Sequence, residues 1–353
     1  MLSQYIPYTQ PGQLFNRVAF GLAEWLRGYY FGAMEQKKIV ELVKDDQVEG
    51  FFSVRRKDVR EYVRGQFVSL ELGDSSGRIG AVMWEPDQFA LDELAEGMVV
   101  KARGVVGEYR DKPQLTVNRI RLATDGEYRL EDIMPHSPQS YEVRKARLFA
   151  LRDQIQNSHI RTLADRFFDD QPWLDGFLNA AAGKLWHHAT IGGLSEHTAN
   201  VTELALRVAQ GYDFLNRDYL IFGGLFHDAG KIATYHTRTV IDFTDEGRLV
   251  DHICLADNWI CERARSVEGF PDKLLVILRH LILSHHGERE FGAPVVPQIP
   301  EAFVLYYCDE IDSKMGAIDR IRSRQDGRGW SEYVNMLNRF LYFGEGESED
   351  NRR

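Results

Sequence analysis

A histidine and an aspartate stand side by side in the stretch Phe226-His227-Asp228-Ala229-Gly230-Lys231, directly after an apolar segment. One such pair is common as a buried structural feature, but imidazole and carboxylate groups also bind metal ions. Nine of the chain's eleven histidines fall between residues 187 and 286, which is an unusual density. They are His187, His188, His197, His227, His236, His252, His280, His285 and His286. This density predicts a metal site.

The spacing of apolar residues around the remaining ligand candidates is helical and predicts that their side chains face a hydrophobic core. His197 shares one helical stripe with apolar residues at spacings of four, three and four. A buried structural histidine gives the same pattern when taken alone. His252 opens a predicted helix, His285 ends another, and Asp309 lies among apolar residues in a third. Several helices that each contribute one or two donors are typical of a bundle with a metal in its core.

The donor types restrict the metal. The candidates offer imidazole nitrogens and carboxylate oxygens, and no cysteine lies in the pattern. Such a set suits Mn, Fe, Zn or Ni better than Ca or a structural zinc cluster.

Two kinds of element must position these residues. Residues 146–341 read as helical, apart from a predicted hairpin with strands at residues 239–243 and 249–250 that is turned by residues 245–247. Residues 37–122 instead contain five alternating segments that predict strands, with a short helical insert around residues 88–94. The sequence thus predicts a multidomain protein, in which a small all-β barrel resembling an OB-fold precedes an all-α domain.

The flanking segments complete the predicted organisation. Residues 1–36 form an N-terminal extension whose apolar stripe from Phe15 to Tyr29 predicts an amphipathic helix. Residues 123–145 read as a linker, and residues 342–353 as a charged tail. The apolar stripe makes self-association into a homo-oligomer an open expectation.

An OB-like barrel binds single strands by stacking bases on aromatic rings and following the backbone with cations. Candidates here are Phe51, Phe67, Trp84 and Tyr109, with Arg55, Arg56, Lys57, Arg60, Arg64 and Arg110. Of these candidates, we predict that four bind the substrate: Phe67, Trp84, Arg55 and Arg56. The alternative is that some of the rings are barrel core and that the run from Arg55 to Arg64 is a solvated loop.

Composition limits the partners. The net charge of −10 gives no general support for nucleic-acid binding, although acidic and basic residues balance within residues 37–122. No long uncharged apolar run and no secretory signal are present in the sequence. We therefore expect a cytoplasmic protein with no membrane partner.

The order His197, His227-Asp228, His252, His285, Asp309 resembles that of the HD-domain metal-dependent phosphohydrolases. The resemblance implies two divalent metal ions. His197, His227, Asp228 and Asp309 would hold one ion, and Asp228, His252 and His285 the other, so that Asp228 bridges them. Mn²⁺ is favoured, with Fe, Zn, Ni and Co left open.

Longer motifs narrow the resemblance. The stretches from His187 to Thr198, His227 to Lys231, Leu283 to Pro294 and Asp309 to Met315 are similar to those of the YhaM-type 3′→5′ exoribonucleases, which also place an OB-fold before the HD domain. This family resemblance covers roughly residues 37–320. It implies a hydrolase of single-stranded RNA, with DNA also open, in which a water activated by two metal ions attacks the phosphodiester.

Further roles follow from that resemblance. Asp228 and Lys231 would be catalytic, with Lys231 binding the phosphate or stabilising the leaving oxygen, unless it is an ordinary surface lysine. His188 and His286 would contact substrate phosphate, and Asp312 would orient a metal ligand. Two other functions stay open: hydrolysis of a small nucleotide or cyclic dinucleotide with a regulatory barrel, and nucleic-acid binding with a structural metal site.

Overall fold

The computed structural model describes residues 36–63, 65–110, 112–124, 126–184, 188–237, 239–324 and 328–345. The chain divides into two compact units, with the main boundary between Pro135 and His136. The amphipathic stretch predicted at residues 14–30, most of the charged tail, Arg64 and His187 lie outside the described residues.

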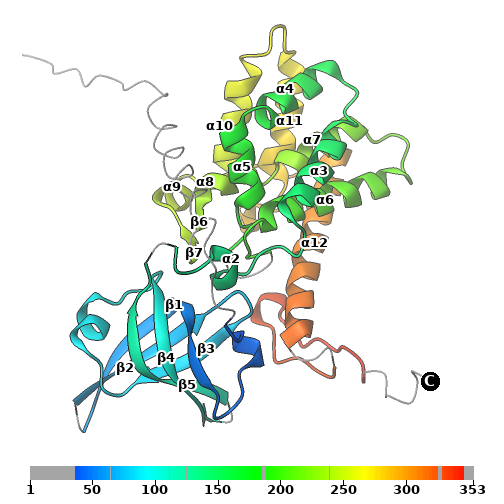
Figure 1. The fold of residues 1–353 in the computed structure, drawn as a ribbon. Coiled ribbons are helices and arrows are strands. Elements are labelled where there is room, and N and C mark those ends of the chain that lie inside the picture. Colours follow the sequence, from blue (N-terminus) through cyan, green and yellow to red (C-terminus); the bar gives the residue numbers. More distant parts are fainter. Residues whose placement is uncertain are drawn as a thin grey trace, which may run out of the picture. The chain divides into compact units, whose positions relative to one another are not determined.

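The first unit is a closed barrel of five strands (Figure 1). Neighbouring strands follow the order β1-β2-β3-β5-β4, and only the β3–β5 pair is parallel. The strands are β1 (Gln47–Tyr62), β2 (Gly65–Gly73), β3 (Arg78–Met83), β4 (Val99–Tyr109) and β5 (Lys112–Leu122), with short helices η2 (Ile39–Glu41), η3 (Phe89–Glu93) and α2 (Leu130–Ile133). This topology confirms the predicted OB-like barrel.

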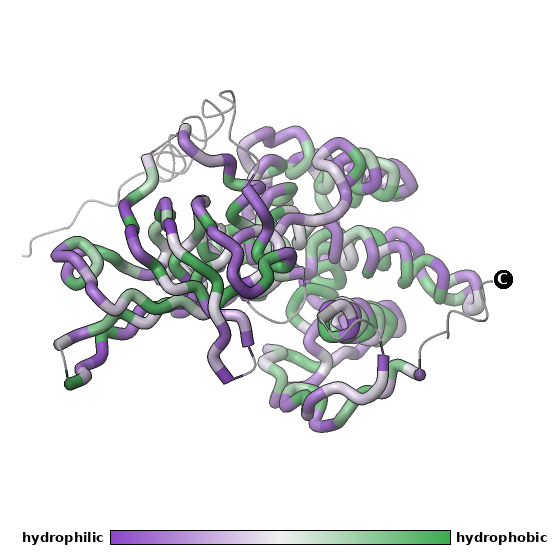
Figure 2. Tube along the Cα trace, turned by 60° about the horizontal axis from the view of Figure 1, so that its bottom comes forward, coloured by the Kyte–Doolittle hydropathy of each residue, from purple (hydrophilic) through white to green (hydrophobic). Residues whose placement is uncertain are grey.

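Alternation along the strands explains how the barrel fills. On β2, Val68, Leu70 and Leu72 are buried, while the residues between them are half-buried. Hydrophobic and hydrophilic residues alternate along the elements of both units (Figure 2). The basic run that starts at Arg55 belongs to β1 and is not a loop, since residues from Arg56 to Tyr62 pair with β2 beyond a β-bulge.

The second unit is helical (Figure 1). Its helices are α3 (Tyr141–Arg152), α4 (Ser158–Phe168), α5 (Gln171–Asn179), α6 (Gly193–Ala209), α7 (Arg217–Phe226), α8 (Lys231–Thr234), α9 (Asp245–Leu249), α10 (His252–Ala264), α11 (Asp272–Ser284) and α12 (Pro300–Arg324), with turns η4 (Arg289–Phe291) and η5 (Asn335–Leu337). One continuous hydrophobic core is formed by residues of α3, α4, α5, α6, α7, α10, α11 and α12. It includes the fully buried side chains of Phe167, Phe222 and Phe226. The predicted all-α domain is confirmed.

Two local predictions in this unit were wrong. The hairpin pairs β6 (Tyr235–Thr237) with β7 (Ile241–Phe243), and the residues expected to form its turn are the helix α9. Thr244 caps that helix, because its Oγ1 accepts a hydrogen bond from the Gly247 N–H. Residues 328–341, expected to be helical, are irregular, with isolated bridges Trp330↔Tyr342 and Val334↔Arg339.

No helix in the described part of the chain is both long and apolar enough to cross a membrane.

Candidate metal centre

The start of α6 places His197 in the core. Gly192 adopts the left-handed conformation before the helix, with φ of 76°. A buried arginine, Arg144, then fixes the first turn, since its Nε donates to Ser195 Oγ at 3.0 Å and its Nη2 to the Leu178 carbonyl at 3.1 Å. His197, two residues after Ser195, is fully buried.

The His227-Asp228 pair follows the end of α7, where His227 caps the helix. The chain then passes against the start of α10. A Cβ on Gly230 would lie 2.0 Å from the His252 carbonyl oxygen, so only glycine allows this approach. The close contact brings the backbone of His252 to the same region as Asp228.

Three donor residues gather beside one oxygen of the Asp228 carboxylate. Its Oδ2 lies 3.4 Å from the Nε2 atoms of both His197 and His227. Oδ1 of Asp309, which α12 supplies, lies 3.1 Å from His197 Nε2 and 3.9 Å from His227 Nε2. The two Nε2 atoms are themselves 3.3 Å apart. These donors match the first predicted ligand group.

The other carboxylate oxygen faces a second group. Oδ1 of Asp228 lies 3.4 Å from His252 Nε2 and 3.7 Å from His285 Nε2. All three atoms are buried, and none has a hydrogen-bond partner among the described residues. Buried polar atoms without partners are costly, and three that converge on one point fit a bound cation. Asp228 therefore presents one oxygen to each group.

All four histidines of the two groups use Nδ1 for a fixed contact. His227 Nδ1 bonds the Gly224 carbonyl at 2.9 Å, and His285 Nδ1 bonds the Ile282 carbonyl at 2.7 Å. His197 Nδ1 lies 2.7 Å from Asp312 Oδ2, and His252 Nδ1 contacts Asp251. Such contacts fix the tautomer that leaves the Nε2 lone pair for a metal.

The charges at the centre favour a cation. Burial would raise the pKa of Asp228, but Lys231 and His227 hold it well below its ordinary value. Burial would likewise lower the pKa of His197, but the carboxylates of Asp228, Asp309 and Asp312 raise it well above its usual range. The carboxylates are thus ionised and attract positive charge, which a divalent ion would supply while displacing protons.

Lys231 is buried, so it is not an ordinary surface lysine. Its Nζ donates to Asp228 Oδ2 at 2.7 Å. Burial opposes the charge of its ammonium group, yet the carboxylates of Asp228 and Asp309 raise its pKa. The ammonium group therefore lies at the same carboxylate oxygen as the first donor group.

The two further histidines lie at the rim. His188 Nε2 is 3.0 Å from Asp312 Oδ2, and the residue has a positive φ of 42°. His286 Nδ1 bonds the Phe291 carbonyl at 2.9 Å, and its ring lies 5.1 Å from that of His252. Burial and the neighbouring histidines lower the pKa of His286 to about 3, so its imidazole is neutral.

Asp312 contacts both His188 and His197, in keeping with its predicted orienting role. Replacing it with asparagine keeps the shape but removes the charged acceptor of the His197 N–H. We expect metal affinity to fall by about 10- to 100-fold, as for other carboxylates that support a metal-bound histidine. Calorimetric titration of metal-free protein with Mn²⁺ measures this, and an unchanged affinity would show that Asp312 does not support His197. Asp319→Asn, one to two turns further along α12, is a matched control.

On the barrel, Phe67 and Trp84 lie together. Their ring centroids are 4.9 Å apart, and Tyr62 packs against both at 5.8 and 5.6 Å. Trp84 is 47% exposed, so this cluster of Tyr62, Phe67 and Trp84 offers ring surface to solvent. Tyr62 was not predicted as part of this cluster from the sequence, although it stands two residues after Arg60, which pairs directly with Phe67.

The predicted cations of β1 differ from one another. Arg56 is exposed and contacts Asp58 at 3.0 Å. Arg55 turns inward, where its Nη2 approaches the Ile133 carbonyl at 3.4 Å, and burial lowers its pKa to about 10. Lys57 caps η3 through the carbonyls of Leu91 and Leu94. Only Arg56 and Arg60 of this run thus lie on the exposed side, among the described residues.

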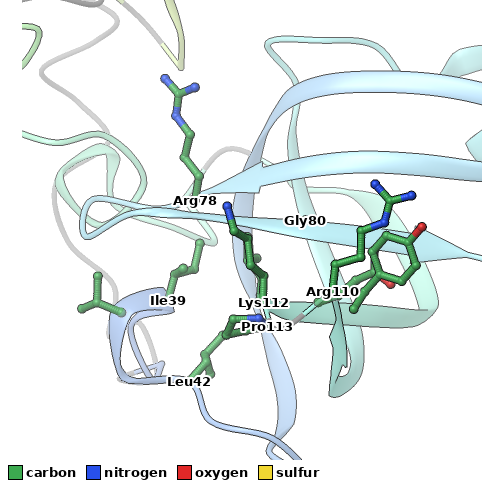
Figure 3. Close-up of a pocket in the computed structure, with 11 residues that line it drawn as sticks. Ile39, Leu42, Arg78, Gly80, Arg110, Lys112 and Pro113 are labelled. Carbon is green, nitrogen blue, oxygen red and sulfur yellow. The ribbon is translucent and has the colours of Figure 1, made fainter. Parts of the chain in front are cut away.

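A pocket of about 620 Å³ opens beside the barrel's β3–β5 seam (Figure 3). Arg78, Arg110 and Lys112 line it, together with an apolar floor that includes Ile39 and Leu42. None of its lining residues in the described part of the chain is acidic. Tyr109, another predicted contact, also lines the pocket, with the Arg110 guanidinium 5.2 Å from its ring. The sequence did not predict this pocket.

Comparison with known proteins matches residues 194–314 to the HD domain family and residues 48–123 to the OB-fold nucleic acid binding domain family. A protein of Geobacillus sp. (strain WCH70) named 3′-5′ exoribonuclease YhaM is 30% identical over 309 residues, covering 87% of this chain and 94% of its own. The chain belongs to the YhaM exoribonuclease family. In this YhaM family member, the HD match encloses all six candidate ligands.

Solved structures similar to this YhaM family member include two of a replication protein A domain from Methanococcus maripaludis. The solution structure of its second OB-fold domain is 23% identical, with a TM-score of 0.21, over 25% of this chain and 94% of that one. A crystal structure is 22% identical, with a TM-score of 0.23, over 26% of this chain and 99% of that one.

Proposed function

We propose that this chain is a metal-dependent 3′→5′ exonuclease that hydrolyses single-stranded RNA, with single-stranded DNA as a possible second substrate. Membership of the YhaM family and the HD and OB-fold domains support this activity. The observation that carries it is the Asp228 carboxylate, which presents one oxygen to each of two groups of metal donors.

In this proposal the centre binds two divalent ions, and we favour Mn²⁺. His197, His227, Asp228 and Asp309 would hold one ion, and Asp228, His252 and His285 would hold the other. When bound, the ions would supply an activated water and neutralise charge on the phosphate. The unpartnered buried atoms of the second group support the second ion.

The chain's own residues position the substrate in this scheme. Lys231 holds a proton on Nζ beside Asp228 and can donate it in a hydrogen bond to a phosphate oxygen or to the leaving oxygen. His286, neutral and anchored through Nδ1, contacts the phosphate through Nε2. His188 contacts it from the other side of the rim, next to Asp312.

The barrel binds the strand in this proposal. Bases stack on the cluster of Tyr62, Phe67 and Trp84, and Arg56 contacts phosphates. The basic pocket lined by Arg78, Arg110 and Lys112 offers further cations for phosphate contacts. The cytoplasmic location and homo-oligomer predicted from the sequence stay predictions.

The activity is tested with 5′-labelled single-stranded RNA and DNA of equal sequence, incubated with the protein in Mn²⁺ or in chelator. A ladder that shortens from the 3′ end only with metal supports the proposal and shows the sugar preference. No shortening by protein that holds metal, together with hydrolysis of a cyclic dinucleotide, would overturn it in favour of a small-nucleotide hydrolase.

Trp84→Ala tests the strand-binding surface. Loss of a stacked base costs about 1–3 kcal/mol, so we expect single-stranded RNA binding to weaken by about 5- to 150-fold. Fluorescence anisotropy with labelled RNA measures this. Trp330→Ala, which changes a 68% exposed tryptophan of the other unit, is the control. Equal affinities for wild type and Trp84→Ala would exclude the cluster from binding.

A further inference from the structure

The segment between Asp228 and His252 leaves the metal centre and returns to it. It comprises α8, the β6–β7 hairpin and α9. At its start, Gly230 packs on the backbone of His252. At its middle, the Thr244 N–H donates to the Thr234 carbonyl at 3.0 Å, which ties the beginning of α9 to the end of α8. Side chains near these joins are therefore held beside the centre.

Tyr235 is the first residue of this hairpin. It directly follows α8, whose first residue, Lys231, donates a hydrogen bond to Asp228. Its side chain is half-buried. The hairpin therefore begins one short helix away from the metal centre.

Two more side chains continue outward from Tyr235. Phe243 is its direct partner across the hairpin, with ring centroids 5.0 Å apart. The guanidinium of Arg248 lies 5.3 Å from the Phe243 ring. Exposure rises along this series, from half-buried Tyr235 to Phe243 at 36% and the Arg248 side chain at 61%. We call Tyr235, Phe243 and Arg248 the aromatic ladder.

Asp242, the acidic residue of the hairpin, is paired with two cations beside the aromatic ladder. It lies 2.7 Å from Lys184 Nζ and 3.5 Å from Arg248 Nη2, so its charge is compensated. A cross-strand aromatic pair stabilises a hairpin by roughly 0.2–1 kcal/mol, which accounts for the contact between the two rings. It does not account for a partly exposed series that starts directly after α8, the helix that Lys231 anchors to Asp228, and ends in a cation.

We propose that the aromatic ladder is a nucleobase-binding site of the helical unit, which stacks the last bases of a single strand while its 3′-terminal phosphodiester lies at the metal centre. The proposal rests on the proposed exonuclease function. Aromatic rings and guanidinium planes stack on any base, so the site would act without sequence preference. Arg248, at the outer end, also contacts the backbone phosphate of the strand.

Phe243→Ala tests the aromatic ladder on 5′-labelled RNA with an ordinary 3′ end and on RNA whose last two residues are abasic. We expect KM for ordinary RNA to rise about tenfold with kcat little changed, and KM for the abasic RNA to be the same in wild type and variant. Phe214→Ala is the matched control. Phe214 is 67% exposed and follows the C-terminal end of α6, whereas His197 lies near the N-terminal end of that helix. An equal loss on both RNAs, or no loss on either, would overturn the proposal.

Binding of a product separates this site from the exonuclease activity itself. Calorimetry with the Mn²⁺-loaded protein compares adenosine 5′-monophosphate with ribose 5-phosphate, which lacks the base. We expect the nucleotide to bind about tenfold more tightly, and Phe243→Ala to remove most of that difference. Equal affinities in the wild type would refute the aromatic ladder. Base-dependent binding by a protein that shortens no RNA would support it and refute the exonuclease.

Discussion

Asp228→Asn is expected to lower phosphodiester hydrolysis by at least about a thousandfold, because a metal centre supplies several kcal/mol of transition-state stabilisation. The substitution keeps the shape of the side chain. It removes the charge that both donor groups share, since Oδ2 faces His197 and His227 while Oδ1 faces His252 and His285. Single-turnover assays on 5′-labelled RNA measure the loss.

Binding of single-stranded RNA should be largely retained in the same variant, because the substitution leaves both the proposed strand-binding surface of the barrel and the aromatic ladder intact. The buried Lys231 loses its nearest carboxylate, so circular dichroism must show that the variant folds. Asp165→Asn is a matched control, since Asp165 forms an ion pair with Arg161 on α4, which carries none of the candidate ligands. Retained hydrolysis by folded Asp228→Asn would contradict the assignment of a bridging carboxylate.

His285→Ala is expected to remove one metal ion and leave the other. His285 is fully buried, and its Nε2 belongs only to the second donor group. We expect elemental analysis to show a fall from two ions per chain to one. Hydrolytic activity should fall by about a hundredfold or more, because a single metal ion would then have to stabilise the charge on the phosphate alone.

His280→Ala is the matched control for this variant. It lies on α11, the helix that His285 directly follows, but its Nε2 accepts a hydrogen bond from the Gln298 backbone N–H at 2.9 Å and takes no part in either donor group. It should keep two ions and near-normal activity. Two ions in His285→Ala, or none, would show that the two donor groups are not separate sites.

The small barrel and the helical domain were readable from the sequence because these fold classes depend on periodicity, whereas the HD assignment came from the resemblance of the motif order to that family. The alternation of apolar residues such as Val68, Leu70 and Leu72 predicts the strands of the barrel. The helical stripe that includes His197 predicts that the His197 side chain points toward the core. The convergence of six ligand candidates was predicted from their order in the family. Periodicity alone does not show which oxygen of Asp228 faces which histidine.

The local errors have local causes. The α9 region contains Gly247 and reads as a turn, but the Thr244 cap and the acidic residues at its start stabilise a short helix instead. Arg55 and Arg56 are adjacent in the sequence and equally basic, yet Arg55, which is unpaired at the bulge in β1, turns inward while Arg56 is exposed. No pattern in the sequence indicated that Phe243 lies beside Tyr235, since that contact depends on the hairpin's register.

Anomalous diffraction from crystals grown with Mn²⁺ would locate the metal ions at Asp228. A two-ion centre predicts two peaks about 3.5–4 Å apart, one on each side of the Asp228 carboxylate. One should contact His197, His227 and Asp309, and the other His252 and His285. A single peak, or two peaks of which either does not contact Asp228, would contradict the two-ion centre.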